Sequence, residues 1–189
     1  MKYLILLFLA FSAFADDSVY VNQIGTGNTV SISQTGTTQS VNITTGSTSS
    51  VDTSNYSITQ QGTGAMSAGI NIPSGYSNTV SISQYDTGNQ TTAIQNLNGA
   101  TNNITINQSG ASNNTFNLIG GAGTNNSANT ITATQSGGIG ADKSFTLNMN
   151  GTNGATVTIQ QTNTTTADSA SMSINCTVGT CGKYSYIKN

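Results

Sequence analysis

The chain has 189 residues and a formal net charge of −2, and its charged fraction of 5% is far below the roughly 25% of ordinary globular domains. Four lysines and no arginine provide no electrostatic basis for binding a phosphate backbone, so we do not expect a nucleic-acid partner. The absence of histidine removes the Ser-His and Cys-His pairs of common hydrolases and the usual transition-metal ligands, so we expect no enzyme, no metal site and no cofactor.

Residues 1–15 have the features of a secretory signal peptide: a lysine at the second position, a short apolar run and a terminal Ala-Phe-Ala. The sequence predicts cleavage after Ala15. The apolar run is too short to span a bilayer as a helix, and no later apolar segment is long enough either, so we expect no stable membrane insertion. The mature chain, residues 16–189, is then predicted to be a single exported domain.

A strand motif recurs through the mature chain, in which two aliphatic residues and a glutamine alternate with small polar residues. The segments NTVSISQ at 28–34, NTVSISQ at 78–84 and NNITINQ at 102–108 are three copies. Residues i, i+2 and i+4 of a strand share one face, so each glutamine lies on the face of the aliphatic residues. Successive glutamines are 26, 24, 24, 27 and 26 residues apart. The glutamines of this series are Gln34, Gln60, Gln84, Gln108, Gln135 and Gln161, and Gln23 is a further one on the first strand.

A second series of strands, mostly without the glutamine, lies between these copies. The first strand of the mature chain, residues 19–23, belongs to this second series by its place in the chain, although it contains a glutamine. Gly-, Asn- and Ser-rich segments typical of turns separate the strands. The middle inward residues that we align in the second series are Ile43, Ile72, Ile94, Leu118, Leu147 and Ile174. The predicted core of both series is Val30, Ile32, Ile43, Ile58, Ile72, Ile82, Ile94, Ile106, Leu118, Ile131, Leu147, Ile159 and Ile174.

Two strands of about six residues and two turns in roughly 25 residues correspond to one coil of a β-solenoid. The sequence therefore predicts an all-β fold, a β-solenoid of about 6–7 two-stranded coils with repeats of about 22–29 residues. Stacking places each glutamine above the previous one at the ~4.8 Å strand spacing, where each amide N–H can reach the carbonyl of the next amide. We expect a cross-β-like inward glutamine ladder that satisfies every amide except those at its ends.

Two other interpretations share part of this pattern. A β-sandwich or barrel also contains short strands, but neither explains why the same polar residue recurs at the third inward position. A disordered linker would fit the polar composition, because few aliphatic residues oppose the chain entropy, but it would not need the alternation.

The C-terminal segment 176–189 departs from the repeat and is a candidate cap. Cys176 and Cys181 flank a short turn, and in an exported chain they form either a disulfide or two reduced thiols. Lys188 lies 27 residues after Gln161, so the position of the next glutamine holds an ammonium group. A lysine can donate to the last glutamine carbonyl but cannot continue an amide column. The alternative is a solvated tail.

The segment GGIGAD at 137–142 matches one half of a calcium-binding nonapeptide repeat. Calcium in such repeats is shared between turns about nine residues apart, and no second copy follows at that spacing. We therefore expect a turn here, with Asp142 as a turn residue rather than a metal ligand.

The segment QIGTGNTVSISQ at 23–34 resembles the repeat of the curlin family, Q-x-G-x-G-N-x-A-x-x-x-Q, with Val30 in place of the alanine. The segments QYDTGN at 84–89 and QSGASN at 108–113 are looser copies. The matching positions are Gln23, Gly25, Gly27, Asn28 and Gln34. The resemblance implies a secreted subunit of an extracellular amyloid fibre on a bacterial cell surface, for biofilm matrix or adhesion. It also implies three partners, namely copies of the chain itself, a nucleating minor subunit and an outer-membrane secretion pore.

Three functions are compatible with the predicted fold. A structural subunit would add strands at the open ends of the solenoid, where the first strand, residues 19–23, offers unpaired N–H and C=O groups. An ice-binding protein would need a regular outward array of threonine; residues 130–134 fit this requirement, but residues 31–33 carry serines instead. A β-helical adhesin or phage-spike fragment would present loops to a receptor.

Overall fold

A computed structural model describes residues 17–24, 29–46, 55–73, 75–76, 78–95, 99–100, 102–120, 128–176 and 180–189. The regular structure of these residues is entirely β. They contain no helix with the length and apolar character needed to cross a membrane. The predicted signal peptide, residues 1–15, lies outside the described residues.

Two seven-stranded sheets make up the fold, and the strand pairings within them are parallel. Sheet A contains, in spatial order, β1 (Asp17–Ile24), β3 (Gln39–Gly46), β5 (Met66–Pro73), β8 (Gln90–Gln95), β11 (Asn114–Gly120), β13 (Lys143–Asn150) and β15 (Asp168–Asn175). Sheet B contains, in spatial order, β2 (Thr29–Gly36), β4 (Asn55–Gly62), β7 (Thr79–Asp86), β10 (Asn103–Gly110), β12 (Thr130–Gly137), β14 (Thr156–Gln161) and β16 (Lys183–Lys188). A third, two-stranded sheet pairs β6 (Gly75–Tyr76) with β9 (Gly99–Ala100).

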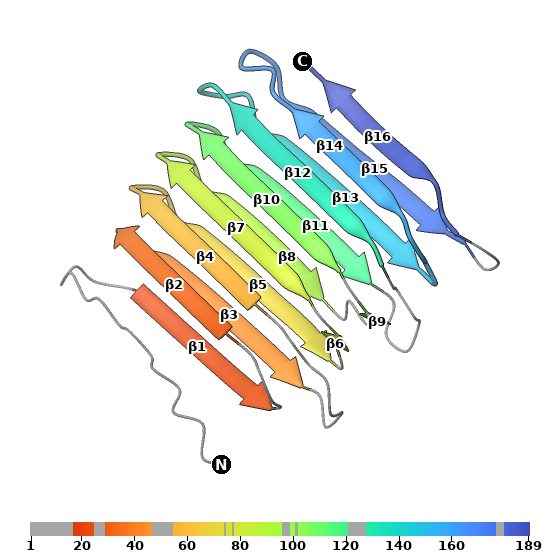
Figure 1. The fold of residues 1–189 in the computed structure, drawn as a ribbon. Coiled ribbons are helices and arrows are strands. Elements are labelled where there is room, and N and C mark those ends of the chain that lie inside the picture. The colour runs from red at the N-terminus through yellow and green to blue at the C-terminus, as the bar shows by residue number, and fades with distance from the viewer. Residues whose placement is uncertain are drawn as a thin grey trace.

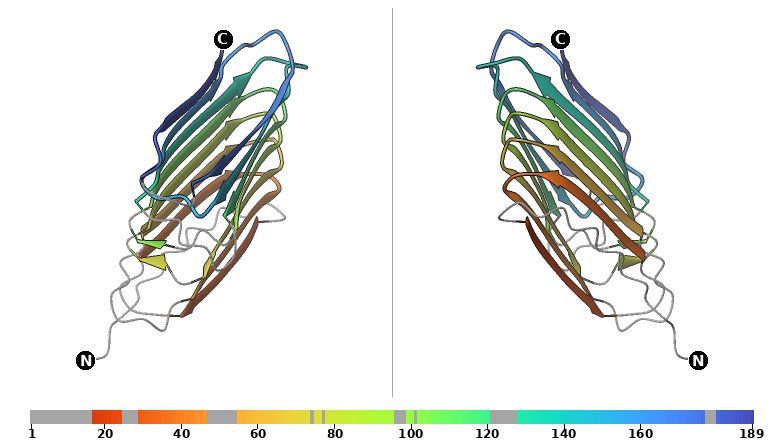
Figure 2. Two further views of the ribbon diagram at one scale, coloured as in Figure 1. Left: turned by 90° about the vertical axis from the view of Figure 1, so that its right-hand side faces the viewer. Right: turned by 90° about the vertical axis from the view of Figure 1, so that its left-hand side faces the viewer.

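Apart from the short β6 and β9, the chain alternates between the two sheets, and each pairing joins neighbouring coils. Figure 1 shows the strands stacked in chain order from the N-terminal to the C-terminal end. Figure 2 shows the two sheets facing each other, with β1 and β16 at opposite ends of the stack. This arrangement confirms the predicted β-solenoid. Each large sheet has seven strands, and the five inner ones pair on both sides. About five turns are therefore flanked by one terminal coil at each end, in agreement with the six to seven coils predicted.

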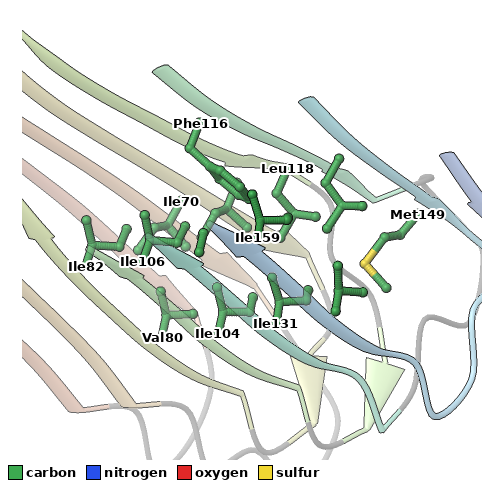
Figure 3. Packing of buried hydrophobic residues seen from close by; sticks show 14 of the residues in the cluster. Ile70, Val80, Ile82, Ile104, Ile106, Phe116, Leu118, Ile131, Met149 and Ile159 are labelled. Atoms are coloured by element: carbon green, nitrogen blue, oxygen red, sulfur yellow. The ribbon is translucent and has the colours of Figure 1, made fainter. Parts of the chain in front are cut away.

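Alternation of inward apolar and outward polar residues explains why these segments form strands. In β10, Ile104 and Ile106 are buried, whereas the intervening Thr105 is exposed. The buried side chains of both sheets meet between the two layers and form one hydrophobic cluster (Figure 3). Within it the rings of Phe116 and Phe145, on neighbouring strands of sheet A, stack with their centroids 6.1 Å apart.

Most of the predicted core residues are buried in this cluster. The fully buried ones are Ile43, Ile58, Ile82, Ile94, Ile106, Leu118, Ile131, Leu147, Ile159 and Ile174. Val30 and Ile32 are half-buried, because β2 lies at the edge of sheet B. The side chain of Ile72 lies outside the described residues.

The alignment that the sequence predicts for the second strand series is wrong in two places. The structure pairs Ile70 of β5 with Ile43 of β3, where the sequence pattern predicts Ile72. The same shift of two residues occurs on β15, where Met172 takes the place predicted for Ile174. A shift of two residues keeps the same side chains facing inward, so alternation alone does not exclude it.

The turns that follow the sheet B strands stack on one another and are joined by side-chain hydrogen bonds. The Asn89 side-chain oxygen accepts from the backbone N–H of Ala65 over 2.9 Å, and Asn113 accepts in the same way from Asn89 over 3.4 Å. Asp142 continues this arrangement by accepting from the backbone N–H of Asn113 over 2.9 Å. The aspartate of the GGIGAD segment therefore binds the turn of the preceding coil.

Candidate assembly site: two polar columns and two open ends

The glutamines of the sheet B strands stack in register inside the solenoid. This glutamine column consists of Gln34, Gln60, Gln84, Gln108, Gln135 and Gln161. Gln34, on the edge strand, is half-buried, and the other five side chains are fully buried. Gln23 does not belong to the column, because β1 lies in sheet A and pairs Gln23 with Thr45. The side chain of Gln23 lies outside the described residues.

Hydrogen bonds between the amides divide the glutamine column into separate runs. Gln34 donates to Gln60 over 2.8 Å. Gln60 in turn donates to Gln84 over 2.7 Å. In the second run the direction is reversed, since Gln135 donates to Gln108 over 2.6 Å. The inward glutamine ladder that the sequence predicts is therefore confirmed, but its amide–amide hydrogen bonds are interrupted between Gln84 and Gln108.

Thr92 of β8 separates the two runs. Its hydroxyl oxygen lies inside the solenoid, where it accepts from Gln84 over 3.3 Å and from Gln108 over 2.8 Å. Both amides also donate to backbone carbonyls of sheet A, those of Ser67 and Thr91, over 3.0 Å. Because acceptors from the facing sheet satisfy these N–H groups, the two glutamines do not need to bond each other.

Replacing Gln84 with leucine should lower the free energy of unfolding by about 1–3 kcal/mol. The substitution removes the Gln84 amide oxygen, which accepts a hydrogen bond from the side chain of Gln60. Both side chains are buried, so water cannot replace the lost acceptor. Urea denaturation measures the effect. Gln61→Leu on the exposed face of β4 is the matched control, and we expect it to change stability little. Equal losses in the two variants would show that the column contributes no stability.

A second polar column, which the sequence analysis missed, runs along the first residues of the sheet A strands. This sheet A column consists of the buried residues Gln39, Met66, Gln90, Asn114, Lys143 and Asp168. Asp17, the first residue of β1, pairs with Gln39 and begins the column. Asn114 donates to Gln90 over 3.0 Å. Extending the inward triplets back by two residues would find Gln39, Gln90, Asn114 and Lys143, because position i−2 shares the face of position i. The misalignment of β5 and β15 by two residues hides Met66 and Asp168 from the same extension.

The two columns meet at the C-terminal end of the solenoid in a cluster of charged and polar groups. This C-terminal charge cluster consists of Lys143, Gln161, Asp168, Tyr186 and Lys188. Asp168 is 7% exposed and accepts from Lys188 over 2.9 Å and from Gln161 over 2.7 Å. The Tyr186 hydroxyl lies 3.1 and 3.0 Å from the two oxygens of the same carboxylate. The ring of Tyr186 packs against that of Phe145, so the cluster borders the hydrophobic core.

Burial and charge shift the pKa values in this cluster. Burial by itself raises the pKa of Asp168, but the hydrogen bonds that it accepts, that from Lys188 first, hold the pKa below its ordinary value. Burial lowers the pKa of Lys143; the Asp168 carboxylate opposes this shift, and the Lys188 ammonium adds to it. Lys143 also donates to the backbone carbonyl of Thr166. The cluster thus combines one carboxylate with two ammonium groups, of which Lys143 is the more buried.

Lys188 lies in register with Gln161, at the position that the glutamine spacing predicts. The hydrogen bond from Lys188 to the glutamine carbonyl, one of the two alternatives left open by the sequence, is not formed. The ammonium binds Asp168 over 2.9 Å, and the carbonyl oxygen of Gln161 is buried without a hydrogen-bond partner. A carboxylate is a stronger acceptor for an ammonium than an amide oxygen is, which explains the preference. The Lys188 side chain remains 48% exposed at the end of the solenoid.

The lowered pKa of Asp168 predicts that acid destabilises the C-terminal coil. The carboxylate contributes its full stability above the unfolded-state pKa of about 3.9, and this contribution is lost as the pH falls through the lower folded-state pKa. Urea denaturation between about pH 6 and pH 2 should show a decline in stability that begins near pH 4. The decline should be smaller for Asp168→Asn, which has no carboxylate at this position. A decline of equal size in both proteins would contradict the role of Asp168.

Cys176 and Cys181 form a disulfide, with their Cα atoms 6.0 Å apart. Cys176 follows β15 and Cys181 precedes β16, so the disulfide joins the two strands of the last coil. The Cys176 sulfur also lies 3.6 Å from the Tyr184 hydroxyl. A covalent bond therefore supplements the charge cluster at the C-terminal end.

Both ends of the solenoid leave strand edges and inward side chains uncovered. Among the described strands, β1 and β2 pair only with the second coil, and β15 and β16 pair only with the coil before them. At the N-terminal end the inward Val19 is 38% exposed. Half-buried hydrophobic residues at the C-terminal end are Ala170, Met172, Tyr184 and Tyr186.

Other chemistry is sparse in the part of the chain that the structure describes. There, no three His, Cys, Asp or Glu side chains gather as a metal site would require. A hollow of about 280 Å³ lies on the outer face of sheet A beside Gly69 and Ala93, and its lining residues carry no charge. Comparisons of the chain with protein-family models, curated proteins and solved structures gave no match. The case for a function therefore depends on the two columns and the two open ends.

Proposed function

We propose that the mature chain is a secreted structural subunit that polymerises end to end, by strand addition, into extracellular amyloid-like fibres. The observation that carries the proposal is the pair of open ends, since β1 and β2 at one end and β15 and β16 at the other each have one edge that no described strand pairs with. Strand edges with unpaired N–H and C=O groups bind further strands, and natural monomers usually block them.

The stacked interior supports the same proposal. A second copy placed on an open end can continue both the hydrophobic cluster and the glutamine column, because successive coils already stack in register. The half-buried Val30 and Ile32 would then become buried, which contributes about 25 cal/mol for each Å² of apolar surface removed from water. Repetition of strands at ~4.8 Å through many copies is the cross-β arrangement of amyloid.

The predicted signal peptide and the resemblance to curlins support a location outside a bacterial cell. In this proposal the fibres serve the biofilm matrix or adhesion. The partners are further copies of the chain, a nucleating subunit and an outer-membrane secretion pore. The proposal requires no enzymatic activity, cofactor, nucleic acid or stable membrane insertion.

The outward side chains of sheet B support ice binding less well. An ice-binding face needs a regular array of one residue type, and β12 does present outward threonines at residues 130–134. The aligned outward positions of β10 hold Asn103, Thr105 and Asn107 instead. For a β-helical adhesin or phage-spike fragment, we identify no receptor-binding loop among the described residues.

Incubation of the purified mature chain, residues 16–189, tests the proposal. We expect fibres visible by electron microscopy that bind thioflavin T and give cross-β reflections at ~4.8 Å and ~10 Å. A chain that stays monomeric under these conditions would contradict the proposal. Inhibition of ice recrystallisation by that monomer would favour ice binding instead.

A further inference from the structure

We infer that copies of the chain join head to tail in one register, in which Asp17 of one copy neutralises the C-terminal charge cluster of the preceding copy. This inference rests on the proposed fibre function. It adds the direction of the fibre, the register of the interface and the electrostatic contact that selects them. The occupant of each open end is a second copy of the same chain.

The backbone register of sheet A determines the position that Asp17 would take; the side chain of Asp17 itself lies outside the described residues. Asp17 pairs with Gln39 at the N-terminal end of the sheet A column. Asp168 pairs with Lys143 at the opposite end of the same column. If β1 of a second copy extends sheet A from β15 in this register, its Asp17 takes the position next to Asp168.

The charge cluster contains one more positive group than negative groups. Lys143 and Lys188 supply two ammonium groups, and Asp168 is the carboxylate at the centre of the cluster. Burial and the Lys188 ammonium both lower the pKa of Lys143, as expected where a buried ammonium is incompletely compensated. Asp142 also acts on Lys143, but it is exposed and bound to the turn at Asn113. A second carboxylate beside Asp168 balances two positive groups with two negative ones, and buried charges are stable only when paired.

The sheet B edges are complementary in the same register. Extending sheet B from β16 by β2 of a second copy aligns Lys188 with Gln34, since both occupy the glutamine column. Gln34 directs its amide nitrogen to Gln60, so its amide oxygen is the group that can accept from the other side. A lysine can only donate, so the two ends match when they meet in this order.

The apolar inward residues of the two ends also face each other in this register. The facing pairs are Ala170 with Val19, Met172 with Val21, Tyr184 with Val30 and Tyr186 with Ile32. Two identical ends do not match. Bringing them together requires one copy to be turned end over end, which either reverses the direction of its strands or places its sheet A against sheet B of the other copy. Joining two C-terminal ends would also bring two positively charged clusters to one interface, which like-charge repulsion disfavours. The fibre therefore has a direction.

Elongation of wild-type seeds by added monomer tests the inference. Asp17→Asn should elongate the seeds about tenfold more slowly than the wild type. Ser18→Lys raises the net charge by the same single unit on the exposed face of β1, and it should elongate them at close to the wild-type rate. The double variant Asp17→Lys/Lys188→Asp exchanges the charges of the two ends. Seeds of the double variant should therefore grow faster in double-variant monomer than seeds of Asp17→Lys grow in Asp17→Lys monomer.

The outcomes separate this interface from the proposed function. Equal elongation by Asp17→Asn and Ser18→Lys, on fibres that the wild type forms normally, would overturn the interface and leave the fibre function standing. A double variant that grows no faster than Asp17→Lys would overturn the charge pairing. Failure of the wild type to form any fibre would overturn both.

Discussion

Replacing Asp168 with alanine should lower the free energy of unfolding by about 2–3 kcal/mol. The substitution leaves Lys143, which is 1% exposed, without the carboxylate next to it in the sheet A column. It also removes an acceptor from Gln161 and from Tyr186. The loss should stay below the roughly 3–5 kcal/mol of a fully buried pair, because Lys188 is 48% exposed. Urea denaturation at neutral pH measures it.

Removing the buried lysine as well should recover much of this loss. Met66 is buried in the same column, which shows that an unbranched thioether side chain fits there. Asp168→Ala/Lys143→Met should therefore be more stable than Asp168→Ala, because methionine needs no counter-charge. Lys183→Met, at an exposed position of β16, is the control for the loss of a lysine. If the double variant were no more stable than Asp168→Ala, the loss would not arise from an uncompensated ammonium.

The inward face of each sheet B strand could be predicted because alternation is a local property. In the segment 78–84, the residues Val80, Ile82 and Gln84 alternate with small polar residues, and all three are buried. The glutamine also indicates the register, since one polar residue among aliphatic ones marks a single position along each strand. The existence of the glutamine column therefore follows from its spacing.

The register of sheet A could not be predicted in the same way. Its strands carry no such marker, and a shift of two residues preserves the inward face. On β5 both Ile70 and Ile72 face inward by alternation. The stacking of Met66 on Gln39 decides that Ile70 lies beside Ile43, and this stacking is a contact between coils.

The charge cluster and the direction of the amide bonds depend on contacts between distant segments. In the sequence, Lys143 directly follows Asp142 at the end of a turn and Asp168 is an isolated charge, and nothing local indicates that Lys143 and Asp168 are buried. Their alignment on neighbouring strands creates the cluster. Likewise Thr92 reaches the glutamine column from the facing sheet, and the glutamine spacing carries no information about it.

Replacing Gly88 with alanine should lower the free energy of unfolding by about 3 kcal/mol or more. Gly88 is buried in the turn between β7 and β8, and an added Cβ would lie 1.8 Å from the backbone carbonyl oxygen of Ser112 in the next coil. A flexible side chain could move aside, but this oxygen belongs to the backbone. The strand pairings of β8 with β5 and β11 hold the coils at a fixed spacing, so the two turns cannot separate without weakening these bonds.

Gly69→Ala, on β5 of the same coil, is the matched control for this close approach between turns. An added Cβ there meets one atom, the Thr92 carbonyl oxygen, at 4.0 Å. Alanine also loses less conformational entropy than glycine on folding, so we expect the stability to be unchanged or raised by up to about 1 kcal/mol. Both substitutions add one methyl group, so the difference between their urea midpoints measures how tightly the turns stack. Equal midpoints would mean that the turns can move apart at no cost, and that strand pairing alone determines the spacing of the coils.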